Sequence, residues 1–139
     1  DVAPSRGLGD VYKRQFEYFV LNDDRQKLYD RIDRRIDIML EDGLLDEVKS
    51  LVDEGYSRDL VSMQGLGYKE MIDYIQERYT LDEAVYTLKR DTRHFAKRQV
   101  TWFKREKQVT WVNKNEFDSE ADILSFMIER LREKEIIQR

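Results

Sequence analysis

The spacing of apolar residues predicts a chain built mainly from helices. Apolar side chains recur every three or four residues over segments 28–40 and 44–52, which is the period of a helix with one buried face. Gly43 follows the first segment and Gly55 follows the second, and glycine commonly ends helices. The two segments therefore predict a helical hairpin.

Capping signals predict three more helices. A loop over residues 57–67 ends in Gly-Leu-Gly and precedes a short apolar segment at 71–75. Thr80 and Glu83 have the spacing of a capping box, so a long helix is expected from there to about residue 105. Ser119 stands before a last amphipathic segment and is expected to cap it.

Two short segments have the composition of strands. Residues 16–21 are aromatic and β-branched, and residues 108–112 alternate between polar and apolar side chains. We therefore expect a mainly α fold with one or two short strands. Residues 1–15 contain the single proline and have no helical period. They resemble adapter- or assembly-derived sequence, and we interpret them as a non-native tail; the alternative is a disordered natural tail.

Composition limits the chemistry that the chain can perform. A length of 139 residues suits one compact domain, and 40% hydrophobic with 39% charged residues is typical of a helix-rich soluble protein. No segment approaches the roughly 18 apolar residues of a membrane helix, so we expect a cytoplasmic location and no membrane partner. The chain has no cysteine and one histidine, His94. Disulfides, thiol nucleophiles and histidine-rich metal clusters are thereby excluded, and we expect His94 to lie on a helix surface.

Charge is distributed unevenly along the chain. Residues 89–107 contain eight basic and two acidic residues, a local charge of +6, so the rest of this −4 chain carries −10. Clustered cations, and not a high overall pI, are what a polyanion such as RNA requires. The sequence therefore predicts an anion-binding face on the long helix.

The arginines of the first helix form the first candidate site. Arg31 and Arg35 are four residues apart, so their side chains lie on one helix face and can hold a polyanion such as diphosphate. The alternative is a solvated face on which Asp33 and Asp37 pair with neighbouring arginines.

Residues 64–69 form the second candidate site. Two glycines allow close approach of a partner, the helix start is expected to direct free amide groups outward, and Lys69 adds a cation. A phosphate or nucleotide is the expected ligand. The alternative is an ordinary turn.

The basic segment 89–105 forms the third candidate site. Its cations are interleaved with Phe95, Trp102 and Phe103, a combination that suits RNA because unstacked bases pack on aromatic and guanidinium planes. The alternative is a solvated helix whose tryptophan belongs to the core.

Three motifs together resemble a known family. LNDDRQKLYDRIDRRIDIMLEDGLLDEVKSL is followed by QGLGYKEMIDY and then by TLDEAVYTLKRDTRHFAKRQVTWFKR. This order is similar to the C-terminal half of tRNA dimethylallyltransferases over about residues 16–112. The most specific part is TRHFAKRQVTWFKR.

The resemblance implies a fold and a reaction. Residues 16–115 are expected to form the C-terminal part of a P-loop-type α/β transferase, followed by an amphipathic helix in 116–139. The intact enzyme, expected to be a monomer, transfers a dimethylallyl group from dimethylallyl diphosphate to an adenosine amine. That adenosine lies 3′ of the anticodon, so the tRNA anticodon stem-loop is the expected partner.

The resemblance also implies that the reaction centre lies outside these residues. The family's phosphate loop, general base and Mg²⁺ site lie upstream, and no GxxxxGK[ST] motif occurs here. We therefore expect no catalytic residue or metal site in this chain, and no activity from it alone. A non-catalytic helical RNA-binding module is the runner-up interpretation, and a helical interaction domain is a third.

Site residues carry over by position. Arg31 and Arg35 match the family's diphosphate-binding arginines, and Arg35 is favoured. Trp102 is as well suited to the core as to RNA. The residues that match tRNA-contacting segments are Gln64, Gly65, Leu66, Gly67, Tyr68, Lys69, Arg93, Lys97, Arg98, Gln99, Thr101, Trp102 and Lys104.

The strand at 16–21 is expected to belong to a parallel sheet whose other strands are missing here, which exposes its edge and apolar surface. We therefore predict that the chain is marginally stable or prone to aggregate. Thermal unfolding followed together with size-exclusion chromatography tests this. A sharp cooperative transition from a monomer would contradict it.

Overall fold

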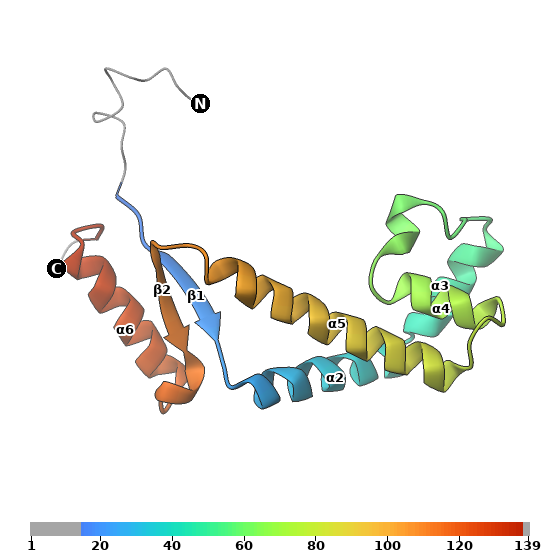
Figure 1. The fold of residues 1–139 in the computed structure, drawn as a ribbon, viewed down its shortest axis with the longest axis horizontal. Helices are drawn as coiled ribbons and strands as arrows, with labels where there is room; N and C mark the ends of the chain where they lie inside the picture. The colour runs from blue at the N-terminus through green and yellow to red at the C-terminus, as the bar shows by residue number, and fades with distance from the viewer. Residues whose placement is uncertain (1–14, 138–139) are drawn as a thin grey trace, which may run out of the picture. The chain divides into compact units, whose positions relative to one another are not determined.

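The computed structural model describes residues 15–137 and confirms the mainly α fold with two short strands (Figure 1). Except for Gln15, the segment interpreted as a tail lies outside the described residues. No helix within the described part is long and apolar enough to cross a membrane. The elements are β1 (Tyr18–Asn22), α2 (Arg25–Glu41), α3 (Leu44–Asp53), η2 (Val61–Gln64), α4 (Tyr68–Ile75), α5 (Leu81–Phe103), β2 (Val109–Asn113), η3 (Lys114–Glu116) and α6 (Glu120–Glu133).

The chain divides into two compact units. The helical unit is Arg25–Arg105 and contains α2, α3, η2, α4 and α5. The described part of the sheet unit consists of residues 15–24 and 106–137, with β1, β2, η3 and α6. All the candidate site residues lie in the helical unit.

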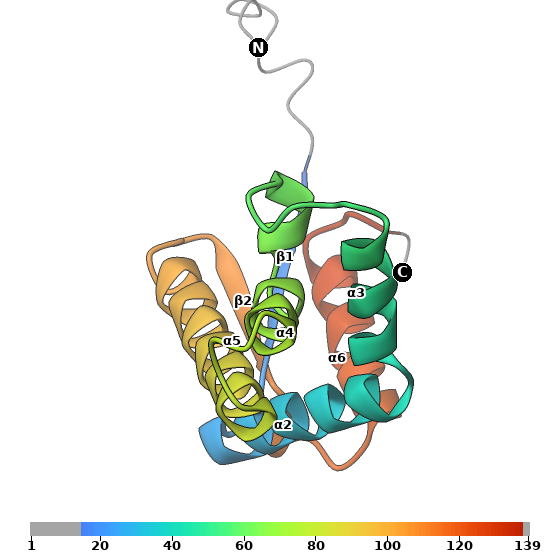
Figure 2. The ribbon, with the colours of Figure 1, turned by 90° about the vertical axis from the view of Figure 1, so that its right-hand side faces the viewer.

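The core of the helical unit is apolar. Helix α4 lies between α3 and α5, and α2 runs beside α5 (Figures 1 and 2). Burial of these side chains is the main driving force for folding of the unit. The buried core residues are Ile36, Leu44, Val48, Met63, Met71, Ile72, Ala84 and Leu88.

Local signals fix the helix ends as predicted. Gly43 has φ 106°, which an L side chain rarely adopts, and this residue separates α2 from α3. The Thr80 hydroxyl accepts from the Glu83 amide, and the Glu83 carboxylate accepts from the Thr80 amide, both at 3.1 Å. The capping box at the start of α5 is thus confirmed.

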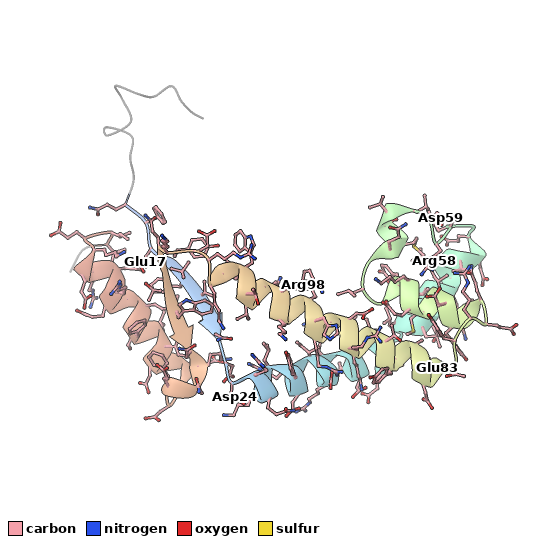
Figure 3. The ribbon with its side chains drawn as sticks, in the orientation of Figure 1. Glu17, Asp24, Arg58, Asp59, Glu83 and Arg98 are labelled. Atoms are coloured by element: carbon pink, nitrogen blue, oxygen red, sulfur yellow. The ribbon has the colours of Figure 1, made fainter. Side chains whose placement is uncertain are left out.

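A buried carboxylate holds the loop before η2 in place. Asp73 on α4 accepts from Arg58 Nε at 2.8 Å and from Arg58 Nη2 at 3.2 Å. Arg78 adds a third contact to the same carboxylate at 3.4 Å. The hydrogen bond to Asp73 raises the pKa of the Arg58 guanidinium above its ordinary value. The loop that contains Arg58 and Asp59 (Figure 3) is therefore tied to α4.

The sheet unit corrects one expectation. Strands β1 and β2 pair in parallel, with Tyr18 opposite Val109 and Asn22 opposite Asn113. The expectation that the first strand has no partner in this chain is therefore wrong. A parallel partner must arrive through a long crossover, and here that crossover is the whole helical unit. In the two-stranded sheet formed by the described residues, β1 keeps one unpaired edge, and Leu21 is exposed.

An ion pair attaches α6 to the sheet. Ser119 caps α6 as predicted, accepting from the Asp122 amide at 3.2 Å, but no residue of this helix is buried. Glu17, whose side chain is 1% exposed, lies 2.6 Å from Lys134 Nζ and 3.7 Å from Arg130 Nε (Figure 3). The Thr110 hydroxyl donates to the same carboxylate. These charged contacts therefore position α6 together with the contact between the Phe117 and Phe126 rings.

These contacts set the pKa of Glu17. Burial by itself raises the pKa of the carboxyl, but the hydrogen bonds from Lys134 and Thr110 and the charges of Lys134 and Arg130 outweigh it. The pKa lies below its ordinary value of 4.5. Because the folded-state pKa is lowered, the carboxylate stabilises the fold above the ordinary pKa, and this stabilisation is lost as pH falls through the folded-state value.

We predict that Glu17→Gln lowers the free energy of unfolding by about 1.5–3 kcal/mol at pH 7, the range for hydrogen bonds to charged groups. The difference from the unsubstituted chain should shrink as pH falls below the ordinary carboxyl pKa. Urea denaturation between pH 7 and pH 3 measures it. Glu129→Gln, which removes an exposed carboxylate of α6, is the control and should change little. A pH-independent difference for Glu17→Gln would contradict the prediction.

Candidate functional site

The two arginines of α2 lie on a face of their own. Arg31 and Arg35 are exposed, whereas Ile36 is buried in the core. At about 100° per residue, Arg31 and Arg35 are about 40° apart around the helix, and Asp33 lies about 160–200° from both. The arginines therefore form one exposed stripe, as their spacing predicted, on the side of α2 opposite Asp33.

The acidic residues of α2 face α5. Asp33 accepts from Arg93 Nη1 through both oxygens, at 2.8 and 3.0 Å. Asp37 lies 2.7 Å from Lys89 Nζ. The alternative in which these two acids pair with neighbouring arginines of their own helix is wrong, because their partners come from another helix. Arg93 is one of the residues that the resemblance matched to tRNA contacts. In the structure its guanidinium donates to Asp33 of α2.

The Gln64–Lys69 loop directs its backbone inward. The buried Gly67 has φ 103°, and its amide donates to Glu70 Oε1 at 2.8 Å. The Lys69 amide donates to the Gly65 carbonyl at 3.4 Å. The expectation that this helix start offers free amides is therefore wrong for Gly67 and Lys69, because the chain satisfies both amides itself.

The side chains of this loop differ in accessibility. Gln64, Gly65 and Leu66 are exposed, and the Gln64 amide donates to the Asp59 carbonyl at 3.2 Å. The Tyr68 hydroxyl donates to Glu47 at 3.3 Å, and the negative charge of Glu47 raises the pKa of Tyr68. Tyr68 is thus held against α3, and the exposed residues at the loop tip remain the accessible part.

Glu70 is a site residue that the sequence analysis missed. It is 3% exposed, and its second oxygen, Oε2, has no hydrogen-bond partner and lies 3.8 Å from Lys69 Nζ. Its position three residues after Gly67 was the available signal, because a glutamate at the third helical position closes a capping box. Glu70 fixes the conformation of the Gly67 turn.

The second half of α5 carries the basic and aromatic surface. Phe95 is 46% exposed and Trp102 is 52% exposed, so Trp102 does not belong to the core of this chain. The Arg98 guanidinium lies 5.9 Å from the centroid of the Phe95 ring, within cation–π range. Arg98 is labelled on α5 in Figure 3. The other exposed candidate residues here are Lys97, Gln99, Thr101 and Lys104.

This surface carries six of the thirteen residues that the resemblance assigned to tRNA: Lys97, Arg98, Gln99, Thr101, Trp102 and Lys104. Within residues 15–137, no carboxylate pairs with Lys97, Arg98 or Lys104. The Thr101 hydroxyl donates to the Lys97 carbonyl at 3.0 Å, so its proton is used inside the helix. Phe95, which the resemblance did not assign, belongs to the same surface. Its exposure could not be read from the sequence, because an apolar residue in a helix is usually expected to face the core.

The expectation that the magnesium site lies outside this part of the chain stays a prediction. No group of three or more histidine, aspartate or glutamate side chains among the described residues is placed to hold a metal ion.

Comparisons with known proteins agree on one family. The family model described as IPP transferase matches residues 4–106. The tRNA dimethylallyltransferase of Lachnoclostridium phytofermentans is 58% identical over 89% of this chain and 40% of its own length. That of Acetivibrio thermocellus is 56% identical over 73% of this chain and 32% of its own length. The matched range begins within the segment interpreted as a tail, and that interpretation stays a prediction.

Solved structures show the same likeness. The full-length tRNA isopentenylpyrophosphate transferase of Bacillus halodurans matches with a TM-score of 0.76 and 46% identity, over 86% of this chain and 40% of that protein. The tRNA isopentenylpyrophosphate transferase of Staphylococcus epidermidis matches with a TM-score of 0.71 and 38% identity, over 81% and 37%. The chain thus spans at most about 40% of the proteins that it resembles.

The two glycines of the loop give a matched pair of substitutions. We predict that Gly67→Ala lowers the free energy of unfolding by about 1–3 kcal/mol, because alanine at φ 103° is strained. An added Cβ would meet only Leu44 at 3.6 Å, so the cost comes from the backbone. Gly65 has φ −66° and open space around it, so Gly65→Ala should be neutral or stabilising by up to about 1 kcal/mol. Urea denaturation compares them, and equal losses would contradict this account.

Proposed function

Because the chain belongs to the IPP transferase family, we propose that it is the C-terminal part of a tRNA dimethylallyltransferase. Such an enzyme transfers a dimethylallyl group from dimethylallyl diphosphate to the exocyclic amine of the adenosine 3′ of the anticodon. The observation that carries the role of this part is the exposed basic and aromatic surface of α5. We assign that surface to the tRNA anticodon stem-loop.

The chemistry of α5 suits RNA. Lys97, Arg98 and Lys104 are exposed cations within one helical segment, and such cations neutralise phosphates with release of counterions. The exposed rings of Phe95 and Trp102 offer planes on which unpaired bases stack. The loop tip at 64–66 adds exposed contacts from a second part of the helical unit. We propose that the exposed Gln64 and Leu66 side chains contact RNA there.

The arginines of α2 suit the leaving group. In the transfer, the amine nitrogen forms a bond to the allylic carbon, the carbon–oxygen bond breaks, and diphosphate leaves with the electron pair while the amine loses a proton. Arg31 and Arg35 form an exposed cationic stripe, and paired guanidinium groups stabilise the charge that develops on diphosphate oxygens. We propose that they steady the diphosphate.

The remaining groups are proposed to lie in other parts of the longer enzyme. No GxxxxGK[ST] motif occurs in these residues, which supports placing the phosphate loop, and with it the general base and the magnesium ion, elsewhere in that enzyme. We therefore propose that these 139 residues alone bind RNA without catalysing transfer, and that the complete enzyme acts as a cytoplasmic monomer.

A fluorescence anisotropy titration with an adenosine-rich anticodon stem-loop RNA at 50 and 200 mM salt tests the RNA surface. If Lys97, Arg98 and Lys104 each contact one phosphate, affinity should fall about 20- to 40-fold over this range. Lys97→Glu/Arg98→Glu should abolish the binding seen at 50 mM salt.

The control is Lys49→Glu/Arg132→Glu, which makes the same change in net charge at exposed positions of α3 and α6 and should retain most of the affinity. Circular dichroism checks that each variant is folded. If the folded chain does not bind at 50 mM salt, or if the control loses as much affinity as the α5 variant, the proposed RNA surface is wrong.

A further inference from the structure

We propose that Asp33 and Asp37 are positioning residues that engage Lys89 and Arg93, so that the RNA-binding surface of α5 begins only at Lys97. This inference rests on the proposed function and refines it. The basic segment that appears continuous in the sequence is thereby divided into two parts with different roles. Its first part pairs with α2, and its second part contacts RNA.

The contacts form a ladder with two rungs. Arg93 Nη1 reaches both oxygens of Asp33, and Lys89 Nζ reaches Asp37 at 2.7 Å. On each helix the two residues are four positions apart, which places them on one face. The ladder therefore joins one face of α2 to one face of α5, two helices that run side by side in opposite directions (Figure 1).

The register of the ladder explains why it stops. A step of four residues forward along α5, from Lys89 to Arg93, matches a step of four back along α2, from Asp37 to Asp33. The next step along α5 arrives at Lys97, and the matching step along α2 arrives at Tyr29. A tyrosine offers no carboxylate at this point. Lys97 is accordingly exposed.

Burial separates the two sets of cations in the same way. The side chains of Lys89 and Arg93 are 23% and 26% exposed, whereas Lys97 and Arg98 are exposed. A cation that already lies against a carboxylate is not available to neutralise a phosphate, so it releases few of the counterions condensed on the RNA and contributes little to the salt dependence of binding. The exposed cations contribute fully.

The ladder has a consequence for the reaction. Arg31 and Arg35 lie on the side of α2 away from Asp33, and the ladder holds that helix against α5. The proposed diphosphate-binding arginines and the proposed RNA surface are thus carried by two helices that share an apolar core and are joined by the two ion pairs. Side-chain ion pairs are directional in a way that apolar contacts are not.

The test compares two charge-matched double variants in the same RNA titration, repeated at five salt concentrations. Lys97→Gln/Arg98→Gln should reduce the slope of log affinity against log salt by about 1.4–1.8, the value for two lost phosphate contacts. Lys89→Gln/Arg93→Gln should leave the slope unchanged and should lower the melting temperature. An equal loss of slope in both variants would overturn the inference while leaving the proposed RNA function intact.

A charge-swapped variant gives a second test in case Lys89→Gln/Arg93→Gln does not fold. Asp33→Arg/Asp37→Lys/Lys89→Asp/Arg93→Asp preserves the ladder with its charges exchanged, so it should restore the melting temperature and keep the slope of the unsubstituted chain. A slope reduced by 1.4 or more, by the same relation, would show that Lys89 and Arg93 contact RNA and would overturn the inference. Absence of RNA binding by every folded chain would instead defeat the proposed function itself, and this refinement with it.

Discussion

The buried part of α5 ends at Leu88, and the organisation of the helical unit depends on this constraint. Ala84 and Leu88 are buried, and no later residue of the helix is. The first half of α5 therefore belongs to the apolar core, which fixes its direction. Beyond Leu88, Lys89 and Arg93 lie against α2, and from Lys97 onward the helix carries exposed cations that are available to a partner. One long helix serves the fold at its start and the proposed RNA surface at its end.

Carboxylates hold together the segments that the apolar core does not reach. Asp73 ties the loop at Arg58 to α4, Glu17 ties α6 to the sheet, and Glu70 closes the turn at Gly67. Each is a largely buried carboxylate with a cation or a backbone amide against it. Such contacts stabilise a fold only when the charge is paired, which is why removal of one partner is expected to cost more than an exposed ion pair is worth.

Features set by neighbouring residues were predictable, and features set by distant ones were not. The Thr80–Glu83 capping box and the Ser119 cap act over three residues, so their sequence spacing was sufficient to place α5 and α6. The pairing of β1 with β2 joins residues 91 positions apart, and the Asp33–Arg93 contact joins residues 60 apart. No local pattern encodes these two contacts. The inward direction of the Gly67 amide is different, because Glu70 three residues later is a local signal that the sequence analysis did not use.

The charge pattern shows how a sequence count can overstate a binding surface. The local charge of +6 over residues 89–107 counts every cation as available to a ligand. In the folded chain, two of these cations pair with Asp33 and Asp37 of α2. A third, Arg90, lies 3.2 Å from Asp91. The field that a polyanion meets is therefore concentrated at the end of α5, where Lys97, Arg98 and Lys104 are exposed. An acidic chain can in this way present a short cationic face, because part of its negative charge is used to position the helix that bears it.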